Sequence, residues 1–411
     1  MTTPEIEGLL RDLAPQALGA VMRGGADFGA AEDAVQEALI AAARQWPEEG
    51  VPDSPRGWII QVASRRLIDW QRRESARRGK EAAAAGWTAS DELTAPPADT
   101  PPTDADDGLL LLFLCCHPSL PRNQQVALTL RAVGGLSTGD IARAFLIPEA
   151  TMTRRITRAK RRLVDSGLEF EMPAEAEFAD RLAAVLEVLY LIFNEGYTAS
   201  SGTSLRRADL TVEAIRLARL LHAQAPSEGE VAGLLALMLL TDARGASRID
   251  DSGKLVPLAE QDRTLWDRDE IAEGSAIIES ALAEYPIGPY QVQAAIAAVH
   301  DEAPSAPETD WLQIVGLYRV LDTIAPSPVV TLNRAVAVGE ADGPRAGLAV
   351  LDTLADDPRL GHHHRVAAVR AHLLERAGDP TAARAGYLQA AQATASAPER
   401  DYLLSRAARL P

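Results

Sequence analysis

Hydrophobic side chains recur every three to four residues along most of the chain, which is the spacing of one face of an α-helix. In residues 32–46 one face is apolar and carries Val35, Leu39, Ala42 and Trp46. The opposite face is polar and carries Glu32, Asp33, Gln36 and Glu37. Residues 58–74 repeat the pattern, with an apolar face made of Ile60, Ala63, Leu67 and Trp70. Both stretches predict amphipathic helices, and together they indicate a first helical domain over residues 1–74.

The helical pattern stops between residues 75 and 107. This stretch contains TASDELTAPPADTPPTDADD, which is rich in Pro, Asp and Thr and has no apolar periodicity. Such a composition cannot bury enough apolar surface to offset the entropy of folding. It therefore predicts a flexible linker, whose extended length is roughly 100 Å at about 3.3 Å per residue.

Residues 108–168 predict a second helical domain that ends in a pair of short helices, LSTGDIARAFLIPEATMTRRITRAKRRL. Ser137 and Asp140 have the spacing of a capping box, which marks the start of the first helix. Pro148 and Glu149 suit the first turn of the second, where a missing N–H costs nothing and an acid meets the positive end of the dipole. The second helix has a predicted buried stripe made of Met152, Ile156, Ala159 and Leu163. This arrangement is typical of a helix-turn-helix motif.

The outward face of that second helix is strongly basic, with six Lys and Arg and no acid in the thirteen residues 151–163. A recognition helix presents its first turns to base edges and its later cations to phosphates. The candidate base readers are Thr151, Thr153, Arg154 and Arg155. The candidate phosphate-binding residues are Arg158, Lys160, Arg161 and Arg162. The alternative is an ordinary solvated amphipathic helix.

Residues 169–411 read as helical to the end, with Pro and Gly at the expected breaks. VGEADGPRAGLAVLD and LERAGDPTAARAGYL superpose at an offset of 36 residues, which aligns Pro344 with Pro380 and Ala346 with Ala382. A period of this length is typical of solenoids built from helix pairs, of which the tetratricopeptide type is the most similar. The sequence thus predicts an all-α protein with a C-terminal tetratricopeptide-like solenoid.

Charge separates the two ends of the chain. The formal net charge is −17, but residues 1–168 carry 20 basic and 22 acidic residues, whereas residues 169–411 carry 21 and 36. The C-terminal part should therefore repel DNA. The amino terminus lacks the features of a signal peptide and the apolar run Leu109–Cys116 is too short to span a bilayer, so we expect a cytoplasmic protein without a membrane partner.

Catalytic and metal-binding patterns are weak. Cys115, Cys116 and His117 are consecutive and cannot all face one ion from a helix, so we interpret the two cysteines as buried thiols. We find no phosphate-binding loop, nucleophile elbow or zinc-protease motif. We therefore expect a binding protein that needs no cofactor or metal, not an enzyme.

The order of these segments resembles that of bacterial extracytoplasmic-function sigma factors. AEDAVQEALIAAARQW and GWIIQVASRRLIDWQRRE are similar to their region 2, and CCHPSLPRNQQVALTLRAVGGLSTGDIARAFLIPEATMTRRITRAKRRL to their region 4. LYLIFNEGYTASSG, EQDRTLWDRDEIAEG and APSPVVTLNRAVAVGEADGP resemble the subgroup with a long tetratricopeptide-like C-terminal extension. The resemblance covers nearly the whole chain.

The resemblance implies binding to core RNA polymerase, through its β′ clamp and β subunit, and to promoter DNA. The implied polymerase-binding residues are Asp33, Gln36 and Glu37. The implied minus-ten-binding residues are Trp58, Arg65, Arg66, Asp69, Arg72 and Arg73. The basic helix would read the minus-thirty-five element, and the linker would span the distance between the two elements. The cations of the minus-ten group suit an exposed strand, and Trp58 is either a base-stacking residue or a core residue.

Three functions are consistent with these observations to different degrees. The leading hypothesis is a sigma factor that directs polymerase to specific promoters and assists melting, with the extension regulating it through a protein or small-molecule partner. The alternative is a one-component helix-turn-helix regulator with a helical-repeat sensor domain. A third, an all-helical enzyme in the acidic half, has no catalytic constellation to support it.

Overall fold

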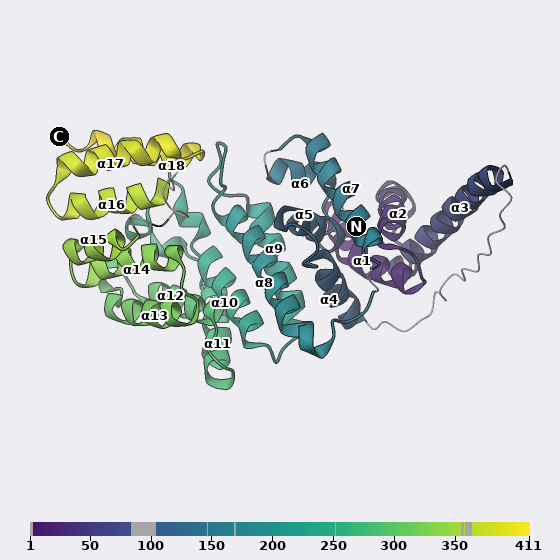
Figure 1. Ribbon diagram of the computed structural model, residues 1–411, viewed down its shortest axis with the longest axis horizontal. Coiled ribbons are helices and arrows are strands. Elements are labelled where there is room, and N and C mark those ends of the chain that lie inside the picture. Colours follow the sequence, from purple (N-terminus) through teal and green to yellow (C-terminus); the bar gives the residue numbers. More distant parts are fainter. Residues whose placement is uncertain are drawn as a thin grey trace. The chain divides into compact units, whose positions relative to one another are not determined.

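The computed structural model describes residues 3–83, 104–145, 147–167, 170–250, 252–354, 357 and 364–411. Within these ranges every regular element is a helix, so the predicted all-α class is confirmed (Figure 1). The same residues include no helix with the length and apolar character needed to cross a bilayer. The chain divides into two compact units, unit 1 over residues 1–191 and unit 2 over residues 192–411.

Unit 1 begins with three helices that pack on one another: α1 (Thr3–Arg23), α2 (Phe28–Glu49) and α3 (Pro55–Ala83). Asp27 caps α2 by accepting a hydrogen bond from the Ala30 amide at 3.0 Å. The predicted apolar faces of α2 and α3 are buried, with one exception. The ring of Trp70 is 50 % exposed, and so is the nearby Ile40 at 52 %. Leu67 is thus buried, whereas Trp70, one turn later on the same predicted face, is half exposed.

Both ends of the predicted linker are helical, so its expected bounds were wrong there. Helix α3 continues to Ala83, because Ala, Arg, Glu and Lys favour helices, and α4 (Asp104–Cys115) begins before residue 107. Asp107 is buried, pairs with Arg23 of α1 and lies against Gly19, where a Cβ would approach it to 2.7 Å. The rest of the predicted linker, residues 84–103, lies outside the described residues.

The second half of unit 1 consists of α4, α5 (Arg122–Ala132), α6 (Thr138–Ala144) and α7 (Glu149–Asp165), followed by the start of α8 (Glu175–Tyr197). Helix α8 joins this half through Arg181, which donates to the Phe113 carbonyl at 2.6 Å, and through Phe178, whose ring packs edge-on against Phe113. We expected a domain boundary between residues 168 and 169. The boundary instead lies within α8, because these contacts hold the first half of α8 against α4.

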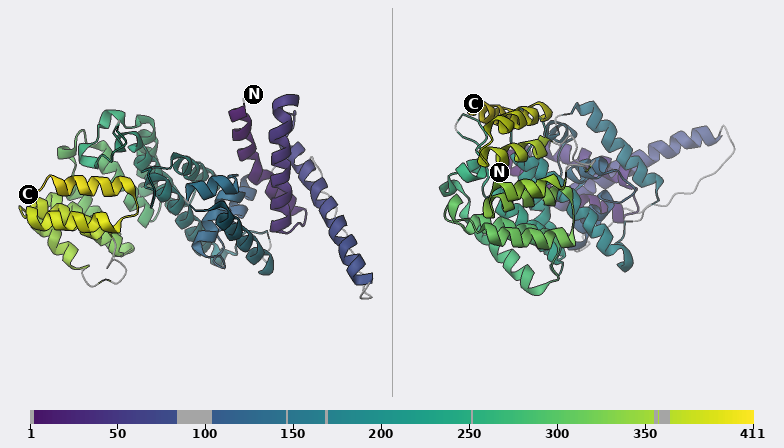
Figure 2. Two further views of the ribbon diagram at one scale, coloured as in Figure 1. Left: turned by 90° about the horizontal axis from the view of Figure 1, so that it is seen from above. Right: turned by 60° about the vertical axis from the view of Figure 1, so that its left-hand side comes forward.

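Unit 2 is a succession of helices, each packed on the next (Figure 2). Its α-helices after α8 are α9 (Ala208–Gln224), α10 (Gly229–Asp242), α11 (Arg268–Glu284), α12 (Pro289–Glu302), α13 (Trp311–Ile324), α14 (Pro328–Ala341), α15 (Pro344–Asp352), α16 (His364–Arg376), α17 (Pro380–Ala393) and α18 (Ala397–Ala408). Its 3-10 helices are η1 (Gly245–Arg248), η2 (Leu258–Glu260), η3 (Arg263–Leu265) and η4 (Ala306–Glu308). The 36-residue offset relates the pair α14–α15 to the pair α16–α17, because Pro344 and Pro380 each stand in the first turn of the second helix.

The two ends of unit 2 are joined. The amide of Ala397, at the start of the last helix, donates to the carbonyl of Gly202 at 2.9 Å. Arg406 in the same helix lies 3.8 Å from the carboxylate of Glu260. The helices of unit 2 therefore curve until α18 meets the segments before α9 and around η2.

Candidate nucleic-acid interface

The helix-turn-helix motif begins as predicted. Ser137 and Asp140 form both bonds of the capping box: the Asp140 amide donates to the Ser137 hydroxyl at 3.1 Å, and the Ser137 amide donates to the Asp140 carboxylate at 3.2 Å. Helix α7 begins at Glu149, and Pro148, which was expected in its first turn, is instead its N-cap residue. The local sequence therefore fixes where both helices of the motif start.

The predicted apolar stripe of α7 is confirmed. Met152, Ile156, Ala159 and Leu163 are all buried, and α7 packs on α5 and α6. Because these side chains occupy one face, the basic side chains are turned away from the core of the motif. Arg154, Arg158, Arg161 and Arg162 are exposed, and Arg155 is half-buried.

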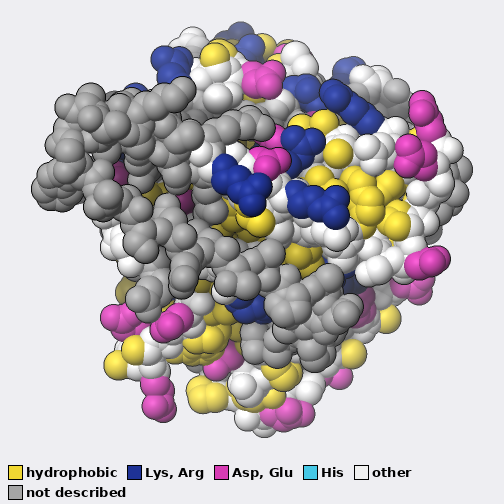
Figure 3. Space-filling view, turned by 90° about the vertical axis from the view of Figure 1, so that its right-hand side faces the viewer, with side chains coloured by type: hydrophobic (Ala, Val, Ile, Leu, Met, Phe, Trp, Pro, Cys, Tyr) yellow, Lys and Arg dark blue, Asp and Glu magenta, His cyan; other side chains and the backbone are white. Residues whose placement is uncertain are grey.

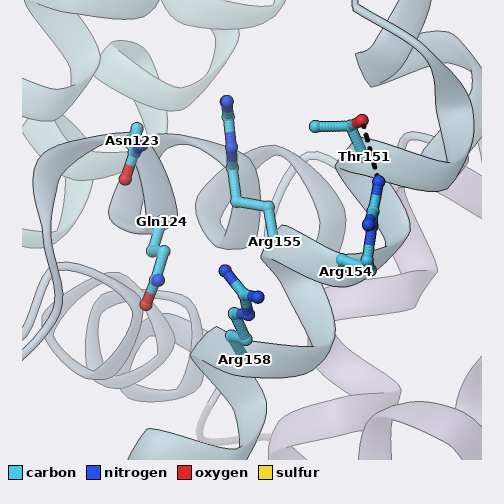
Figure 4. Close-up of a pocket in the computed structure, with 6 residues that line it drawn as sticks. All are labelled: Asn123, Gln124, Thr151, Arg154, Arg155 and Arg158. Carbon is cyan, nitrogen blue, oxygen red and sulfur yellow. Dashed lines mark hydrogen bonds between the residues drawn. The ribbon is translucent and has the colours of Figure 1, made fainter.

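Three arginines of α7 surround a cavity of about 250 Å³ together with the start of α5 (Figure 4). The lining residues are Asn123, Gln124, Thr151, Arg154, Arg155 and Arg158. In Figure 4, Arg155 and Arg158 project from α7 into the space that faces α5. Clustered guanidinium groups bind phosphate and guanine edges through paired hydrogen bonds. The cavity therefore has the charge of an anion-binding cleft, and we refer to it as the arginine cleft.

Sequence reasoning missed the contribution of α5. Gln124 is only 9 % exposed, and its side-chain oxygen has no hydrogen-bond partner among the described residues. Asn123 is exposed beside it. Both stand in the first turn of α5, well before the motif, and no spacing in the sequence signals that they lie opposite α7.

Thr153, Arg154 and Arg161 of α7 have partners within their own helix. Arg154 donates to the Ala150 carbonyl at 3.2 Å and to the Thr151 hydroxyl at 3.4 Å. The Thr153 hydroxyl donates to the Glu149 carbonyl at 2.9 Å. Arg161, which is 82 % exposed, lies 3.7 Å from Asp165. These exposed contacts are weak and can exchange for contacts with a ligand.

Lys160 differs from the other cations of α7, because it faces α2. Its ammonium nitrogen lies 2.6 Å from the carboxylate of Asp33 and also pairs with Glu32. Glu32 is 1 % exposed and accepts a further hydrogen bond from Arg131 of α5 at 2.8 Å. We refer to Glu32, Asp33, Arg131 and Lys160 as the Glu32 cluster. The expected solvent-facing position of Glu32 was wrong, because its two cationic partners come from α5 and α7.

The expected polymerase-binding residues share one face of α2. Asp33 and Glu37 are exposed and Gln36 is half-buried, and all three line a groove of about 520 Å³. Glu37 pairs with Arg66 of α3 at 2.6 Å, and Trp70 lines the same groove. The structure thus brings the expected polymerase-binding residues next to Arg66, one of the expected minus-ten-binding residues.

The other expected minus-ten-binding residues lie along α3. Arg65, Asp69 and Arg72 are exposed, whereas the side chain of Arg73 lies outside the described residues. Trp58 is half-buried, and its ring packs edge-on against the buried Trp46 with centroids 5.6 Å apart. This contact makes Trp58 part of the packing between α2 and α3.

Cations and apolar side chains lie close together on the surface of unit 1. Figure 3 shows several Lys and Arg side chains grouped beside hydrophobic ones on the face turned to the viewer. Acidic side chains also occur on this face, so its charge is mixed.

The two cysteines are buried thiols, as predicted. Burial raises the pKa of Cys116 to about 12, and its sulfur lies 3.5 Å from the Thr129 hydroxyl. Burial also raises the pKa of Cys115. In the described part of the chain no three His, Cys, Asp or Glu side chains gather as a metal site would require.

Comparison with known families divides the chain into three matched segments. Sigma-70 region 2 matches residues 9–77, and Sigma-70 region 4 matches residues 110–163. A family of unknown function, DUF6596, matches residues 181–282. The first two segments contain α2 and α3 and the helix-turn-helix motif, respectively.

Individual relatives match different shares of the chain. The uncharacterized protein R00370 of Rhizobium meliloti (strain 1021) is 44 % identical over 398 residues, which is 95 % of this chain and 92 % of that protein. The probable ECF RNA polymerase sigma factor SigI of Mycobacterium tuberculosis, from strains CDC 1551 and H37Rv, is 32 % identical over 142 residues, which is 34 % of this chain and 48 % of SigI. No solved structure matches the chain significantly.

Proposed function

The chain belongs to one family with the R. meliloti protein R00370, and it contains sigma-70 regions 2 and 4. We propose that it is an extracytoplasmic-function sigma factor of the cytoplasm. It binds core RNA polymerase, directs it to promoters with two elements and assists melting. The observation that carries the proposal is the coexistence in unit 1 of an acidic and amide face on α2 with a basic recognition helix, α7.

Each surface has one proposed partner. Asp33, Gln36 and Glu37 bind the β′ clamp of polymerase, and the β subunit holds region 4. The exposed cations of α3 follow the non-template strand of the minus-ten element. The arginine cleft between α5 and α7 receives the minus-thirty-five duplex, with Arg154 and Arg155 toward base edges and Arg158, Arg161 and Arg162 toward phosphates.

The Glu32 cluster must open before Lys160 can bind DNA and Asp33 can bind polymerase. While Lys160 is paired with Glu32 and Asp33, it cannot neutralise a DNA phosphate, and Asp33 is less available to polymerase. We therefore propose that α7 separates from α2 when the protein binds polymerase and promoter together. The two elements of such a promoter lie roughly 50–60 Å apart at about 34 Å per helical turn, a distance that requires regions 2 and 4 to separate.

The test is promoter-specific transcription by purified bacterial core polymerase with this protein, on sheared genomic DNA whose transcripts are sequenced. We expect transcripts that share two upstream elements and disappear without the protein. An absence of specific transcripts, together with a shift of a palindromic duplex by the protein alone, would instead support the one-component regulator. Gln36→Ala should abolish the transcripts and leave duplex binding intact, with the exposed Glu48→Gln on the same helix as control.

The C-terminal extension is the proposed regulatory part, and we propose that its helix pairs are a tetratricopeptide-like solenoid. Because the first half of α8 packs on α4, a truncation that tests this role should end after Tyr197, the last residue of α8. Higher transcription from the truncated protein would support inhibition by the extension, and lost transcription would support a required contact. Unchanged transcription would contradict a regulatory role.

A further inference from the structure

Unit 2 contains a cavity of about 770 Å³ on the inner faces of its later helices. Helix α13 contributes Trp311, Ile314 and Tyr318, which are three and four residues apart and so share one helix face. Helix α14 contributes Asn333, Val336, Ala337 and Glu340 at the same spacing. Small-molecule sites in proteins have volumes of about 300–1,000 Å³. The cavity therefore has the size of a ligand site and two regular walls.

The walls are apolar and partly aromatic. Trp311 and Ile314 form one side, and Val336 and Ala337 form another. The His300 ring packs edge-on against Trp311, with centroids 5.2 Å apart, and fixes the position of the indole. A flat apolar molecule would bury its surface here, at about 25 cal/mol per Å² of apolar area.

Arg263, a cation that lines the cavity, has hydrogen-bond donors that are not used within the described part of the protein. The Nη1 of Arg263 donates to the carbonyls of His300 at 2.6 Å and Ala303 at 2.5 Å, and its guanidinium lies 4.5 Å from the centre of the Trp266 ring. These contacts fix the group in place. No hydrogen bond of its Nε or Nη2 is found among the described residues, and the nearby carboxylate of Asp301 lies 2.8 Å from Arg244 instead.

Other polar groups of the cavity also lack partners within the described ranges. They are the ring nitrogens of His300, the amide of Asn333 and the hydroxyl of Tyr402. Burial lowers the pKa of His300 to about 3, so the ring is neutral at physiological pH. These three groups can each donate and accept, whereas Arg263 only donates, so the four together offer more donors than acceptors. A ligand with acceptor oxygens therefore suits them.

The carboxylate that lines the cavity, that of Glu340, already forms an ion pair. Glu340 pairs with Arg376, and the His372 ring lies 3.8 Å away. It therefore offers little attraction to a cationic ligand. Arg263 forms no ion pair of its own among the described residues, so an anion is the ligand charge that suits the cavity.

We propose that this cavity binds a small organic acid with a flat apolar body, whose carboxylate pairs with Arg263 and whose body lies between Trp311 and Val336. The inference goes beyond the proposed sigma-factor activity, and its test does not depend on transcription. It assigns to unit 2 a ligand class and a site where a metabolite can act on the extension.

The test is calorimetric titration of the full chain with three acids that have flat apolar bodies, indole-3-acetate, phenylacetate and 2-naphthoate, and with the neutral amide of each. We expect at least one acid to bind with a Kd below about 1 mM and its amide to bind at least tenfold more weakly, since a charged hydrogen bond is worth about 1.5–3 kcal/mol. Failure of all three acids, or equal binding of acid and amide, would overturn the proposal.

Variants locate the site. Arg263→Gln should weaken acid binding at least tenfold, whereas Arg319→Gln, which removes an exposed cation from α13 outside the cavity, should not change it. If Arg263→Gln fails to fold by circular dichroism, Val336→Phe is the second variant, because it fills the apolar part of the cavity and leaves Arg263 in place. Unchanged binding in a folded Arg263→Gln or Val336→Phe would contradict the assignment.

Discussion

Lys160 of α7 holds its ammonium nitrogen 2.6 Å from the carboxylate of Asp33 in α2, so a proposed DNA-binding residue is bound to a proposed polymerase-binding residue. The pair is anchored by Glu32, which is buried beneath it and also bonded to Arg131. A surface ion pair alone contributes little, but a buried carboxylate must keep its partners. The contact therefore ties α7 to α2 as long as region 4 lies in this position.

Removing the buried carboxylate should loosen this contact. We expect Glu32→Gln to lower the free energy of unfolding by about 1–3 kcal/mol, because Lys160 and Arg131 lose a buried partner. The released Lys160 should tighten binding of a minus-thirty-five duplex about three- to tenfold. Urea unfolding and fluorescence anisotropy measure the two effects. Glu48→Gln, an exposed acid on the same helix, is the control, and equal duplex affinity in both variants would argue against the contact as a restraint on α7.

The arginines of α7 should separate into two classes. Arg154→Ala or Arg155→Ala should change the base preference at one or two positions of the minus-thirty-five element by about 1–3 kcal/mol. Arg161→Ala should weaken all duplexes alike and reduce the slope of affinity against salt by about one. Anisotropy titrations on a set of single-base variants at several salt concentrations separate the classes. A change of base preference in Arg161→Ala would contradict the assignment.

Glu270 should make unit 2 less stable at high pH. Burial, and then the nearby Asp242 and Asp267, raise the pKa of this carboxyl to about 7. The unfolded chain releases the proton near its ordinary pKa, so stability falls as pH rises from about 4.5 through 7 and stays low above it. Glu270→Gln should thus raise Tm at pH 8 and leave it nearly unchanged at pH 5. Glu279→Gln, exposed on the same helix, should show no such pH dependence.

Close contact between α14 and α15 should make Gly347 intolerant of substitution. A Cβ at this position would lie 2.6 Å from the Ala335 carbonyl oxygen and 2.9 Å from the Cα of Gly339, so the helices would have to separate. We expect Gly347→Ala to cost about 1–3 kcal/mol. Gly316→Ala is the matched control, since nothing lies within 4 Å of its Cβ and alanine favours the helix by up to about 1 kcal/mol. Urea unfolding that ranks the two variants in the opposite order would refute this explanation.

Local patterns predicted the parts of the fold that depend on neighbours in the sequence. The stripe of α7 and the capping box at Ser137 follow from spacings of three and four residues, and both were confirmed. The composition of residues 75–107 was less informative, because Asp107 is buried by its pairing with Arg23 of α1, 84 residues earlier.

The misses at the candidate site have the same origin. Glu32 has the spacing of an exposed residue, but it is buried because Arg131 and Lys160, which lie 99 and 128 residues later in the sequence, pair with it. Trp70 continues the apolar period of α3, but its ring is half exposed, whereas Leu67, one turn earlier, is buried. Gln124 became a lining residue of the arginine cleft because α5 packs beside α7. A one-dimensional pattern does not contain such pairings between distant segments.

The hydrogen bond between Ala397 and Gly202 changes how unit 2 should come apart. In an open array of helix pairs each repeat contacts only its neighbours, so the terminal pair can fray while the rest stays folded. Here α18 also contacts the segment before α9, so unfolding α18 breaks contacts at both ends of unit 2 at the same time. Unit 2 should therefore lose its structure in one step, and α18 should exchange its amide hydrogens as slowly as the helices at the centre.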